Sequence, residues 1–322
     1  MPDSQAALRK LGVYVPPQEG ASFRGIRFLS DEVVIESDFP YGHGMGLRRT
    51  ILHDLLSRRA AEAGVPVYWN SRGLRLTAAG VEIGDETIRA DYLIGADGLN
   101  SSVRRTRGLA GTHHESIRYG FRQHFRGERW SEFVEVYWAR ACQLYVTPIG
   151  ADEISVAVIS SDPQIRLKEA IRRCPLLKSR LERFTAISSE RGSLTVSRRL
   201  RHVCKGKTAL LGDASGSIDA ITGEGLCLSF KQAGVLADAI ESGDLDRYQW
   251  YHDRLARRPR AMEYLMLMLS RSDSLRRRVI SGLAREPAMF SRFIAIHVGQ
   301  SSFLDIPFSE VCRFGRRLLA AC

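Results

Sequence analysis

The residues best suited to chemistry lie between Thr208 and Phe230, in the segment TALLGDASGSIDAITGEGLCLSF. A short apolar run ends at Gly212-Asp213, a loop of mainly small side chains follows, and Gly223-Glu224-Gly225 opens a helical pattern. A carboxylate there can accept hydrogen bonds from hydroxyl groups, and glycines let backbone N–H groups approach a ligand closely. The helix N-terminus favours negative charge on that ligand. The segment therefore predicts a site for a polyhydroxylated or electron-rich ligand.

A second segment, ADYLIGADGLNSSVRR over residues 90–105, has a similar organisation. Its apolar run Tyr92-Leu93-Ile94 leads into Gly95-Ala96-Asp97-Gly98, and a short helical turn that contains Arg104 follows. Ligands of α/β proteins collect at the carboxyl ends of parallel strands. We therefore expect Asp97 and Gly98 to lie at the same site as the first segment.

Together the two segments resemble the flavin-binding motifs of FAD-dependent aromatic hydroxylases, halogenases and geranylgeranyl reductases. This is a superfamily of FAD-dependent oxidoreductases and monooxygenases. Asp219 late in the loop, followed by Thr222-Gly223-Glu224-Gly225, is most similar to the geranylgeranyl reductase branch. The Trp-x-Trp-x-Ile-Pro signature of halogenases is absent from the sequence, which disfavours a halogenase.

The resemblance implies FAD as cofactor, with NAD(P)H as a transient reductant. Asp213 would hold the ribityl chain, and the amides around Gly223, Gly225 and Leu226 would lie beneath the pyrimidine edge of the flavin, where reduced flavin carries negative charge. The cofactor-binding residues implied in this way are Arg49, Asp97, Gly98, Arg104, Gly212, Asp213, Gly223, Gly225, Leu226 and Cys227.

Two positions depart from the family pattern, and a third motif supports it. Ala220 stands where the family commonly has Pro, and Cys227 stands where hydroxylases commonly have Asn, so a hydroxylase subtype is not assigned. Cys227 either packs in the core or has a redox role. Gly46–Leu56, GLRRTILHDLL, resembles the family's Arg-x-x-Leu-His-x-x-Leu helix and places Arg49 at the flavin. The alternative is an ordinary amphipathic helix with an exposed Arg49.

Members of this superfamily begin with a strand, a Gly-x-Gly-x-x-Gly turn and a helix, which hold the pyrophosphate. Residues 1–322 contain no such unit. The competing explanations are an internal methionine taken as the start, a truncated gene, and a second chain that supplies the unit. We favour the first two, because losing central strands of a parallel sheet exposes apolar faces. A truncated chain is expected to be unstable and to bind FAD poorly.

The composition is that of an ordinary globular protein, with 44% hydrophobic and 26% charged residues. No run of eighteen apolar residues predicts a membrane-spanning helix, and the N-terminus does not resemble a signal peptide. The six cysteines lack Cys-x-x-Cys spacing and are expected to be free thiols in a cytoplasmic protein. His43 has no ligand-type residue at suitable spacing, so no metal site is expected.

The net charge of +11 raises the question of nucleic-acid binding. The basic residues are mostly Arg, they are spread along expected helix faces, and no helix-turn-helix, RNA-recognition or zinc signature accompanies them. The sequence therefore predicts no nucleic-acid partner.

The predicted fold class is α/β: an incomplete FAD-binding Rossmann-like domain, an inserted antiparallel β-sheet substrate domain, and C-terminal helices. The expected divisions are residues 1–112 with 201–243, residues 113–200, and residues 244–322. Alternating aromatic and β-branched residues predict strands in the inserted sheet. The expected strands are Ile117–Phe125, Phe133–Ala139, Gln143–Val146, Ile154–Ile159 and Ser193–Arg199. Aromatic residues able to line a substrate pocket there are Phe121, Phe125, Tyr137, Trp138 and Tyr145.

The C-terminal part has two interpretations. Residues 261–269 are apolar on several faces, and Ser274–Glu286 is rich in Arg. One interpretation is a helix that lies on an anionic membrane, giving a peripheral membrane contact. The other is helices that pack on the flavin domain with their Arg side chains in water, since Met-rich stripes are mostly core filler.

The sequence predicts an FAD-dependent monooxygenase that uses NAD(P)H on a hydrophobic or aromatic small molecule. The chemistry belongs to the flavin, and no residue is nominated as catalytic. One alternative is a geranylgeranyl reductase-type enzyme that reduces alkenes of prenyl lipids. Another is a truncated, flavin-free remnant that acts as a binding or structural module.

Overall fold

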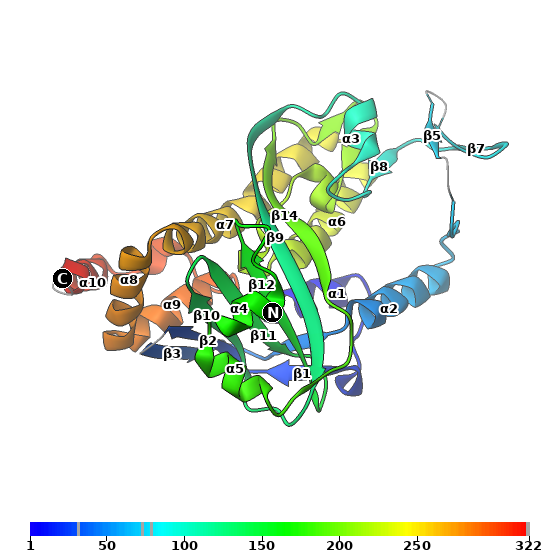
Figure 1. Cartoon of the computed structure of the whole chain (residues 1–322). Coiled ribbons are helices and arrows are strands. Elements are labelled where there is room, and N and C mark those ends of the chain that lie inside the picture. Colours follow the sequence, from blue (N-terminus) through cyan, green and yellow to red (C-terminus); the bar gives the residue numbers. More distant parts are fainter. Residues whose placement is uncertain (31–32, 72–73, 78–79, 320–322) are drawn as a thin grey trace.

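The computed structural model of the chain describes residues 1–30, 33–71, 74–77 and 80–319 (Figure 1). Its largest element is an eight-stranded sheet whose strands come from three parts of the chain. They are β2 (Gly25–Ser30), β3 (Val33–Asp38), β9 (Thr112–Arg126), β10 (Phe133–Ala139), β11 (Cys142–Pro148), β12 (Glu153–Ser160), β13 (Thr185–Ala186) and β14 (Arg191–Leu200). The order is β13-β9-β12-β11-β10-β2-β3, with β14 also paired to β9.

The pairing is antiparallel throughout this sheet except between β2 and β10, which run parallel. The strands expected from alternation in residues 117–199 are confirmed. The strands β2 and β3, which the expected divisions placed in the FAD-binding part, pair with each other and through β2 with β10 of the large sheet. The physical reason is that β2 is buried on both faces: Ile26 and Phe28 pack in one cluster and Leu29 packs in another.

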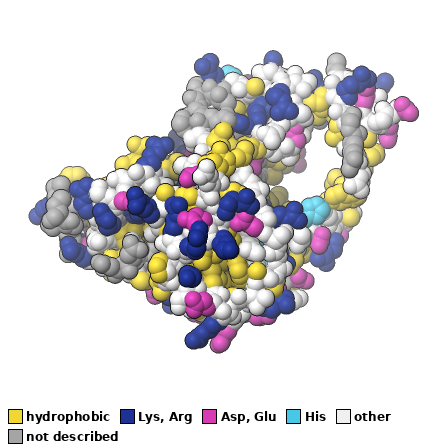
Figure 2. All heavy atoms as spheres, in the orientation of Figure 1, with side chains coloured by type: hydrophobic (Ala, Val, Ile, Leu, Met, Phe, Trp, Pro, Cys, Tyr) yellow, Lys and Arg dark blue, Asp and Glu magenta, His cyan; other side chains and the backbone are white. Residues whose placement is uncertain are grey.

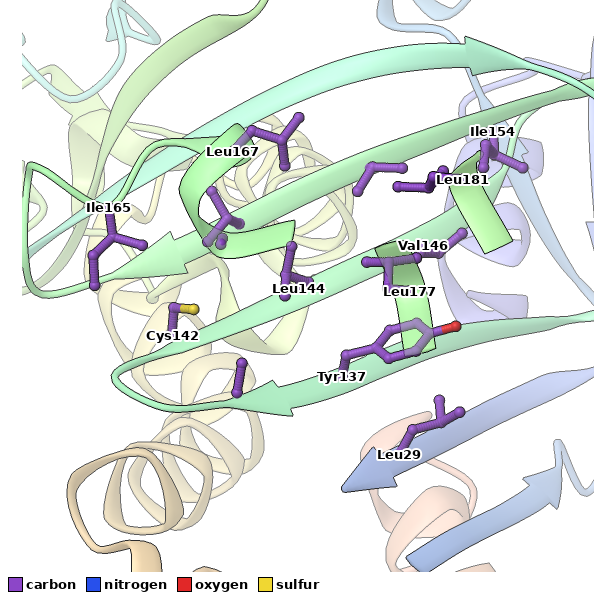
Figure 3. Packing of buried hydrophobic residues seen from close by; sticks show 14 residues of the cluster. Leu29, Tyr137, Cys142, Leu144, Val146, Ile154, Ile165, Leu167, Leu177 and Leu181 are labelled. Carbon is purple, nitrogen blue, oxygen red and sulfur yellow. The ribbon is translucent and has the colours of Figure 1, made fainter. Parts of the chain in front are cut away.

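Helices cover both faces of the large sheet. On one face, α4 (Leu167–Arg172) and α5 (Pro175–Leu181) pack their leucines on β10 and β11, as Figure 3 shows for Leu167, Leu177 and Leu181 above Tyr137 and Leu144. Burying one such leucine contributes roughly 1.5–3 kcal/mol. The other face meets α7 (Leu245–Arg271), α8 (Asp273–Arg285) and α9 (Pro287–His297), which carry most of the C-terminal apolar side chains.

A smaller sheet contains the two motif strands. Its order is β15 (Cys204–Lys205), β16 (Thr208–Leu210) and β8 (Leu93–Gly95), with β16 parallel to β8. The helices α3 (Ser102–Thr106) and α6 (Gly225–Glu241) follow the two strands, and α1 (Pro2–Lys10) packs on α6. This part is the Rossmann-like portion that the sequence predicted.

The remaining elements lie around these two sheets. The strands β1 (Gly20–Phe23) and β4 (Gly44–Leu47) pair with each other, and α10 (Phe308–Leu319) closes the described chain beside α8. No helix of the described residues is both long enough and apolar enough to span a membrane.

The helix α2 (Arg49–Glu62) and the strands β5 (Arg75–Leu76), β6 (Gly80–Ile83) and β7 (Glu86–Arg89) extend away from the body (Figure 1). The helix expected from the Gly46–Leu56 motif is confirmed. The apolar pairs of residues 74–76, 81–83 and 87–88 predict a small antiparallel sheet, which β5, β6 and β7 confirm. The apolar run at residues 65–68 predicts a further strand, and this prediction was wrong, because these residues are exposed and pair with no strand of the described chain. An apolar run alone does not make a strand when nothing supplies its hydrogen-bond partner.

Charged side chains of both signs are dispersed over the face seen in Figure 2, and no large area of that face carries Lys and Arg alone. The absence of a nucleic-acid partner stays a prediction.

Glu135 is the centre of a polar cluster inside the large sheet. Its side chain is fully buried and accepts hydrogen bonds from Arg27, Arg180, Trp130 and Tyr137 at 2.6–3.2 Å. Because two guanidinium groups and two neutral donors surround it, the buried carboxylate is well satisfied.

Replacing Glu135 with Gln should destabilise the protein by about 3 kcal/mol, because it leaves Arg27 and Arg180 facing an uncharged group inside the protein. Glu36→Gln is the matched control: Glu36 also pairs with Arg27, but its side chain is 42% exposed, so the cost should be below about 1 kcal/mol. Urea unfolding of wild type, Glu135→Gln and Glu36→Gln measures the loss of stability in each variant. Equal costs for the two variants would contradict the interpretation.

Candidate functional site

The two motif loops lie side by side at the carboxyl ends of adjacent parallel strands. Thr208 to Leu210 pairs in register with Leu93 to Gly95, and the Leu211 N–H donates to the Gly95 carbonyl at 2.9 Å. A Cβ at Gly95 would stand 2.7 Å from the Val103 side chain, so only glycine lets strand and helix approach this closely. The arrangement places Asp97 and Asp213 at one edge of the small sheet.

The Asp97-Gly98 loop is held mainly by its own helix. The Asp97 Oδ2 atom accepts hydrogen bonds from the Ser102 and Val103 N–H groups, at 2.6 and 3.2 Å, and from the Ser102 hydroxyl. These hydrogen bonds keep the pKa of Asp97 below its usual value even though burial opposes this. Asp97 thus fixes the start of α3, and its role in cofactor binding stays a prediction.

Arg104 connects the two motif loops. Its buried guanidinium donates to the Ala214 carbonyl at 2.9 Å and to the Leu99 carbonyl at 2.7 Å. The side chain lies behind the loops and acts here as a support for both. Direct contact between Arg104 and a cofactor stays a prediction.

The turn at Ala220–Thr222 is held by the large sheet. Asp219 Oδ1 accepts the Ile221 N–H at 2.9 Å and lies 3.2 Å from Arg118 Nη1 on β9, while Tyr145 on β11 donates to the Ile221 carbonyl at 3.1 Å. The Asp219 N–H donates to Glu263 of α7 at 2.5 Å. The sequence prediction missed Arg118 and Glu263, for which the only signal was a charged residue among apolar neighbours.

The loop from Gly223 to Gly225 presents open backbone. Gly223 has φ +66°, a conformation that favours glycine, and a Cβ at either glycine would meet no atom within 4 Å. The side chain of Leu226 packs against the apolar cluster that Leu8 of α1 and Leu52 of α2 form. The N–H groups at the start of α6 therefore form the edge of the site. A flat ligand can therefore lie directly on this backbone.

Arg49 and Asp213 lie close enough for their charges to interact. Within the described residues neither makes a hydrogen bond through its side chain or an ion pair within 4 Å, although their charges interact. Both keep an exposed surface, yet surrounding protein removes enough water to raise the pKa of Asp213, against the effect of Arg49. A carboxylate and a guanidinium without partners, beside open glycine backbone, fit the ribityl and ring portions of FAD.

The remaining glycines and Cys227 shape the site from behind. Gly212 and Gly98, with φ +60° and +73°, form the tight turns after the two strands. The thiol of Cys227 is buried and lies 3.1 Å from Asp3 of α1, and burial raises its pKa to about 11. A protonated, buried thiol favours packing over the redox role.

A cavity of about 890 Å³ opens beside the Gly223 loop. The inner face of the large sheet forms one wall and α7–α9 form the other, and both walls are largely apolar. Phe121 and Tyr145 line it as the sequence suggested, whereas Phe125, Tyr137 and Trp138 do not. Tyr137 lies on the opposite face of β10, toward α5, because side chains alternate along a strand.

Residues 31–263 match the family model described as an FAD binding domain, which is more than half of the chain. This chain belongs to the FAD binding domain family.

Two relatives extend this result. Digeranylgeranylglycerophospholipid reductase 2 of Methanothermobacter thermautotrophicus is 30% identical over 237 residues, which cover 66% of this chain and 60% of that protein. Chloroplastic geranylgeranyl diphosphate reductase of Oryza sativa is 27% identical over 197 residues, covering 52% of this chain and 40% of that protein. The chain thus spans 40% to 60% of the length of these two relatives.

Solved structures show the same fold at low sequence identity. A flavoprotein/dehydrogenase from Cytophaga hutchinsonii superimposes with a TM-score of 0.71 at 14% identity, over 97% of this chain and 86% of that one. The flavin-dependent brominase Bmp2 gives 0.66 at 16% identity, over 99% and 88%. The α/β fold of this FAD-binding family member is therefore established.

Glu224, between the two glycines of the loop, is buried beneath the site. Burial raises its pKa to about 7, although the nearby Arg258 acts in the opposite direction. The neighbouring His297 is also buried, which lowers its pKa to about 4, so its ring is neutral at neutral pH.

Glu224→Gln should change how stability depends on pH. The folded-state pKa of about 7 exceeds the ordinary value of 4.5, so the stability that Glu224 contributes is complete below pH 4.5 and is lost as pH rises through 7. The Gln variant lacks this loss. Relative to wild type it should therefore gain up to about 3 kcal/mol between about pH 4.5 and about pH 8.

Urea unfolding at several pH values measures this gain. Glu241→Gln, at the exposed end of the same helix, is the control and should show no such gain. A constant difference between wild type and Glu224→Gln across the pH range would contradict a raised pKa.

Proposed function

We propose that this protein is an FAD-dependent oxidoreductase of the monooxygenase type that uses NAD(P)H and acts on a hydrophobic small molecule. The observation that carries the proposal is the position of the cavity. Its apolar walls meet the Gly223 loop directly, so a bound substrate would lie against the loop that we expect to carry the flavin. Concave, mainly apolar sites with a few polar groups are typical of small-molecule binding.

Redox chemistry is what FAD supplies when bound, and the residues of this chain position and shield it. Asp213 would accept hydrogen bonds from ribityl hydroxyls, and Arg49 would contact the ring from the other side. The N–H groups at the start of α6 would stabilise negative charge. The apolar walls exclude water, and burial raises the pKa of Tyr145, so its hydroxyl stays neutral and continues to donate to the Ile221 carbonyl.

A second candidate is reduction of alkenes in prenyl lipids. The cavity walls carry flexible and aromatic side chains of α7–α9, among them Met262, Leu269 and Phe290, that suit a long unbranched or prenyl chain. Arg122 and Arg191 line the same cavity and form no ion pair within the described chain, so they offer positive charge to an anionic head group. The names of the two relatives above agree with this candidate.

Asp213→Ala should weaken FAD binding about tenfold or more, because it removes a charged hydrogen-bond acceptor worth about 1.5–3 kcal/mol. Quenching of flavin fluorescence on titration with the protein measures the affinity. Asp238→Asn, an exposed change on α6, is the control and should bind as wild type does. A wild-type chain that shows no absorbance band near ~450 nm with FAD in excess would favour the flavin-free binding module instead.

Oxygen dependence separates the two enzymatic candidates. If the protein is a monooxygenase, hydrophobic aromatic compounds should stimulate NAD(P)H oxidation only when oxygen is present. If it is an alkene reductase, geranylgeranyl compounds should be reduced under strictly anaerobic conditions. Product analysis by mass spectrometry distinguishes a gain of one oxygen from a gain of two hydrogens. Neither product with FAD bound would contradict both candidates.

A further inference from the structure

Glu224 is a buried carboxylate that has one close ion-pair partner, Arg258, and no hydrogen-bond donor aligned on either oxygen. Its side chain is 3% exposed, and neither oxygen accepts a hydrogen bond. Arg258 Nη2 lies 2.9 Å from Oε1 without the alignment of a hydrogen bond, and His297 Nδ1 lies 3.5 Å from Oε2, also without one. Leaving a buried carboxylate in this state is costly while it is ionised, and the cost falls when it binds a proton.

The titratable groups around Glu224 come from every element packed against it. The charged groups are Asp3 and the amino group of Met1 at α1, Lys231 on α6 and Arg258 on α7. The uncharged titratable groups are Cys227 on α6 and His297 on α9. Asp3 already pairs with Lys231 at 2.8 Å and lies 3.5 Å from Arg258. Burial lowers the pKa of both His297 and the Met1 amino group. Arg258 is therefore the main positive charge left to oppose Glu224, and one added negative charge nearby is enough to favour protonation.

Glu224 also lies close to the site in the chain and in space. It is the residue between Gly223 and Gly225, whose open backbone would face the pyrimidine edge of the flavin. His297 Nδ1 lies 3.5 Å from Glu224 Oε2, and both His297 and Thr222 line the cavity. His297 therefore contacts the cavity on one side and lies close to the carboxylate of Glu224 on the other, which provides a short route for a proton.

We propose that Glu224 is a proton-binding site coupled to the charge of the cofactor, and that it exchanges its proton with the cavity through His297. When negative charge gathers over the Gly223–Gly225 loop, the carboxylate takes one proton from cavity water and becomes a neutral acid. When that charge leaves, the proton returns. Only the O–H bond of the acid forms and breaks, and Glu224 supplies no electrons.

The coupling is electrostatic and reciprocal. Two like charges on opposite sides of one loop repel each other in a region of low polarity, so the charge that favours protonation of Glu224 is in turn stabilised by that protonation. This inference rests on the proposed function, because the charge in question is that of bound, reduced FAD. A purely structural carboxylate would be held by hydrogen bonds, and its protonation would not follow the charge of the cofactor.

The test is the pH dependence of the two-electron reduction potential of the FAD-loaded chain, measured between about pH 6 and about pH 9 with FAD in excess. Above about pH 7 the potential of wild type should fall about 30 mV per pH unit more steeply than that of Glu224→Gln, because wild type binds one more proton on reduction. Glu241→Gln should follow wild type. Equal slopes in wild type and Glu224→Gln would overturn the proposal.

A second variant keeps the test decisive if Glu224→Gln does not fold. Arg258→Gln removes the positive charge nearest the carboxylate, which should raise the proton affinity of Glu224 about tenfold. The steeper fall of the reduction potential with pH should therefore begin about one pH unit higher than in wild type. An unchanged onset would show that the proton binds to another group, which overturns the assignment to Glu224.

NMR separates failure of this inference from failure of the proposed function. In the flavin-free chain with carbon-13-labelled glutamate, the signal missing from Glu224→Gln should titrate near 7, and titration near 4.5 would overturn the proton site. If that signal titrates near 7 but no FAD binds, the proton site stands. The proposed function and the coupling to FAD then fall together.

Discussion

The site depends on one buried ion pair, between Arg118 of the large sheet and Asp219 of the loop. The two side chains are 5% and 0% exposed and approach to 3.2 Å, and Asp219 also receives the Ile221 N–H. Removing two charges from water costs several kcal/mol per ion, so such a pair is weak evidence for stability. Its structural consequence is clearer. It ties the Ala220–Thr222 turn to β9 and so sets where the Gly223–Gly225 backbone lies.

The other features of the site follow from that connection. The small sheet brings Asp97 and Asp213 to one edge, and Arg104 joins the loops that follow them. The large sheet then stands across from the start of α6, and α7–α9 close the remaining side to leave the cavity. Open glycine backbone therefore meets apolar walls, which is the combination that a cofactor and a hydrophobic substrate require together.

Charges are distributed unevenly around this site. Arg49, Arg122 and Arg191 line the cavity and form no ion pair within 4 Å in the described part of the chain. Glu224 lies behind the loop, where Arg258 is its main opposing charge and neither of its oxygens accepts a hydrogen bond. The open face thus attracts negative charge, and the buried face opposes it unless Glu224 is protonated. Ligand binding on the open face and protonation on the buried face are thus connected through Glu224, the residue between Gly223 and Gly225.

The sequence by itself determined the motifs, the strands of the inserted sheet and the family, because period-two alternation and glycine-bounded loops depend on local sterics. β10 at Phe133–Ala139 was predicted residue for residue. Only the tertiary structure decided that β2 and β3 join the large sheet, that residues 65–68 form no strand, and that Tyr137 faces α5 while Tyr145 faces the cavity. It alone also brought Arg118, Glu263 and His297 to the loop. Those outcomes depend on partners that are distant in the chain, and no local pattern of residues records which partner a strand edge or a buried charge will meet.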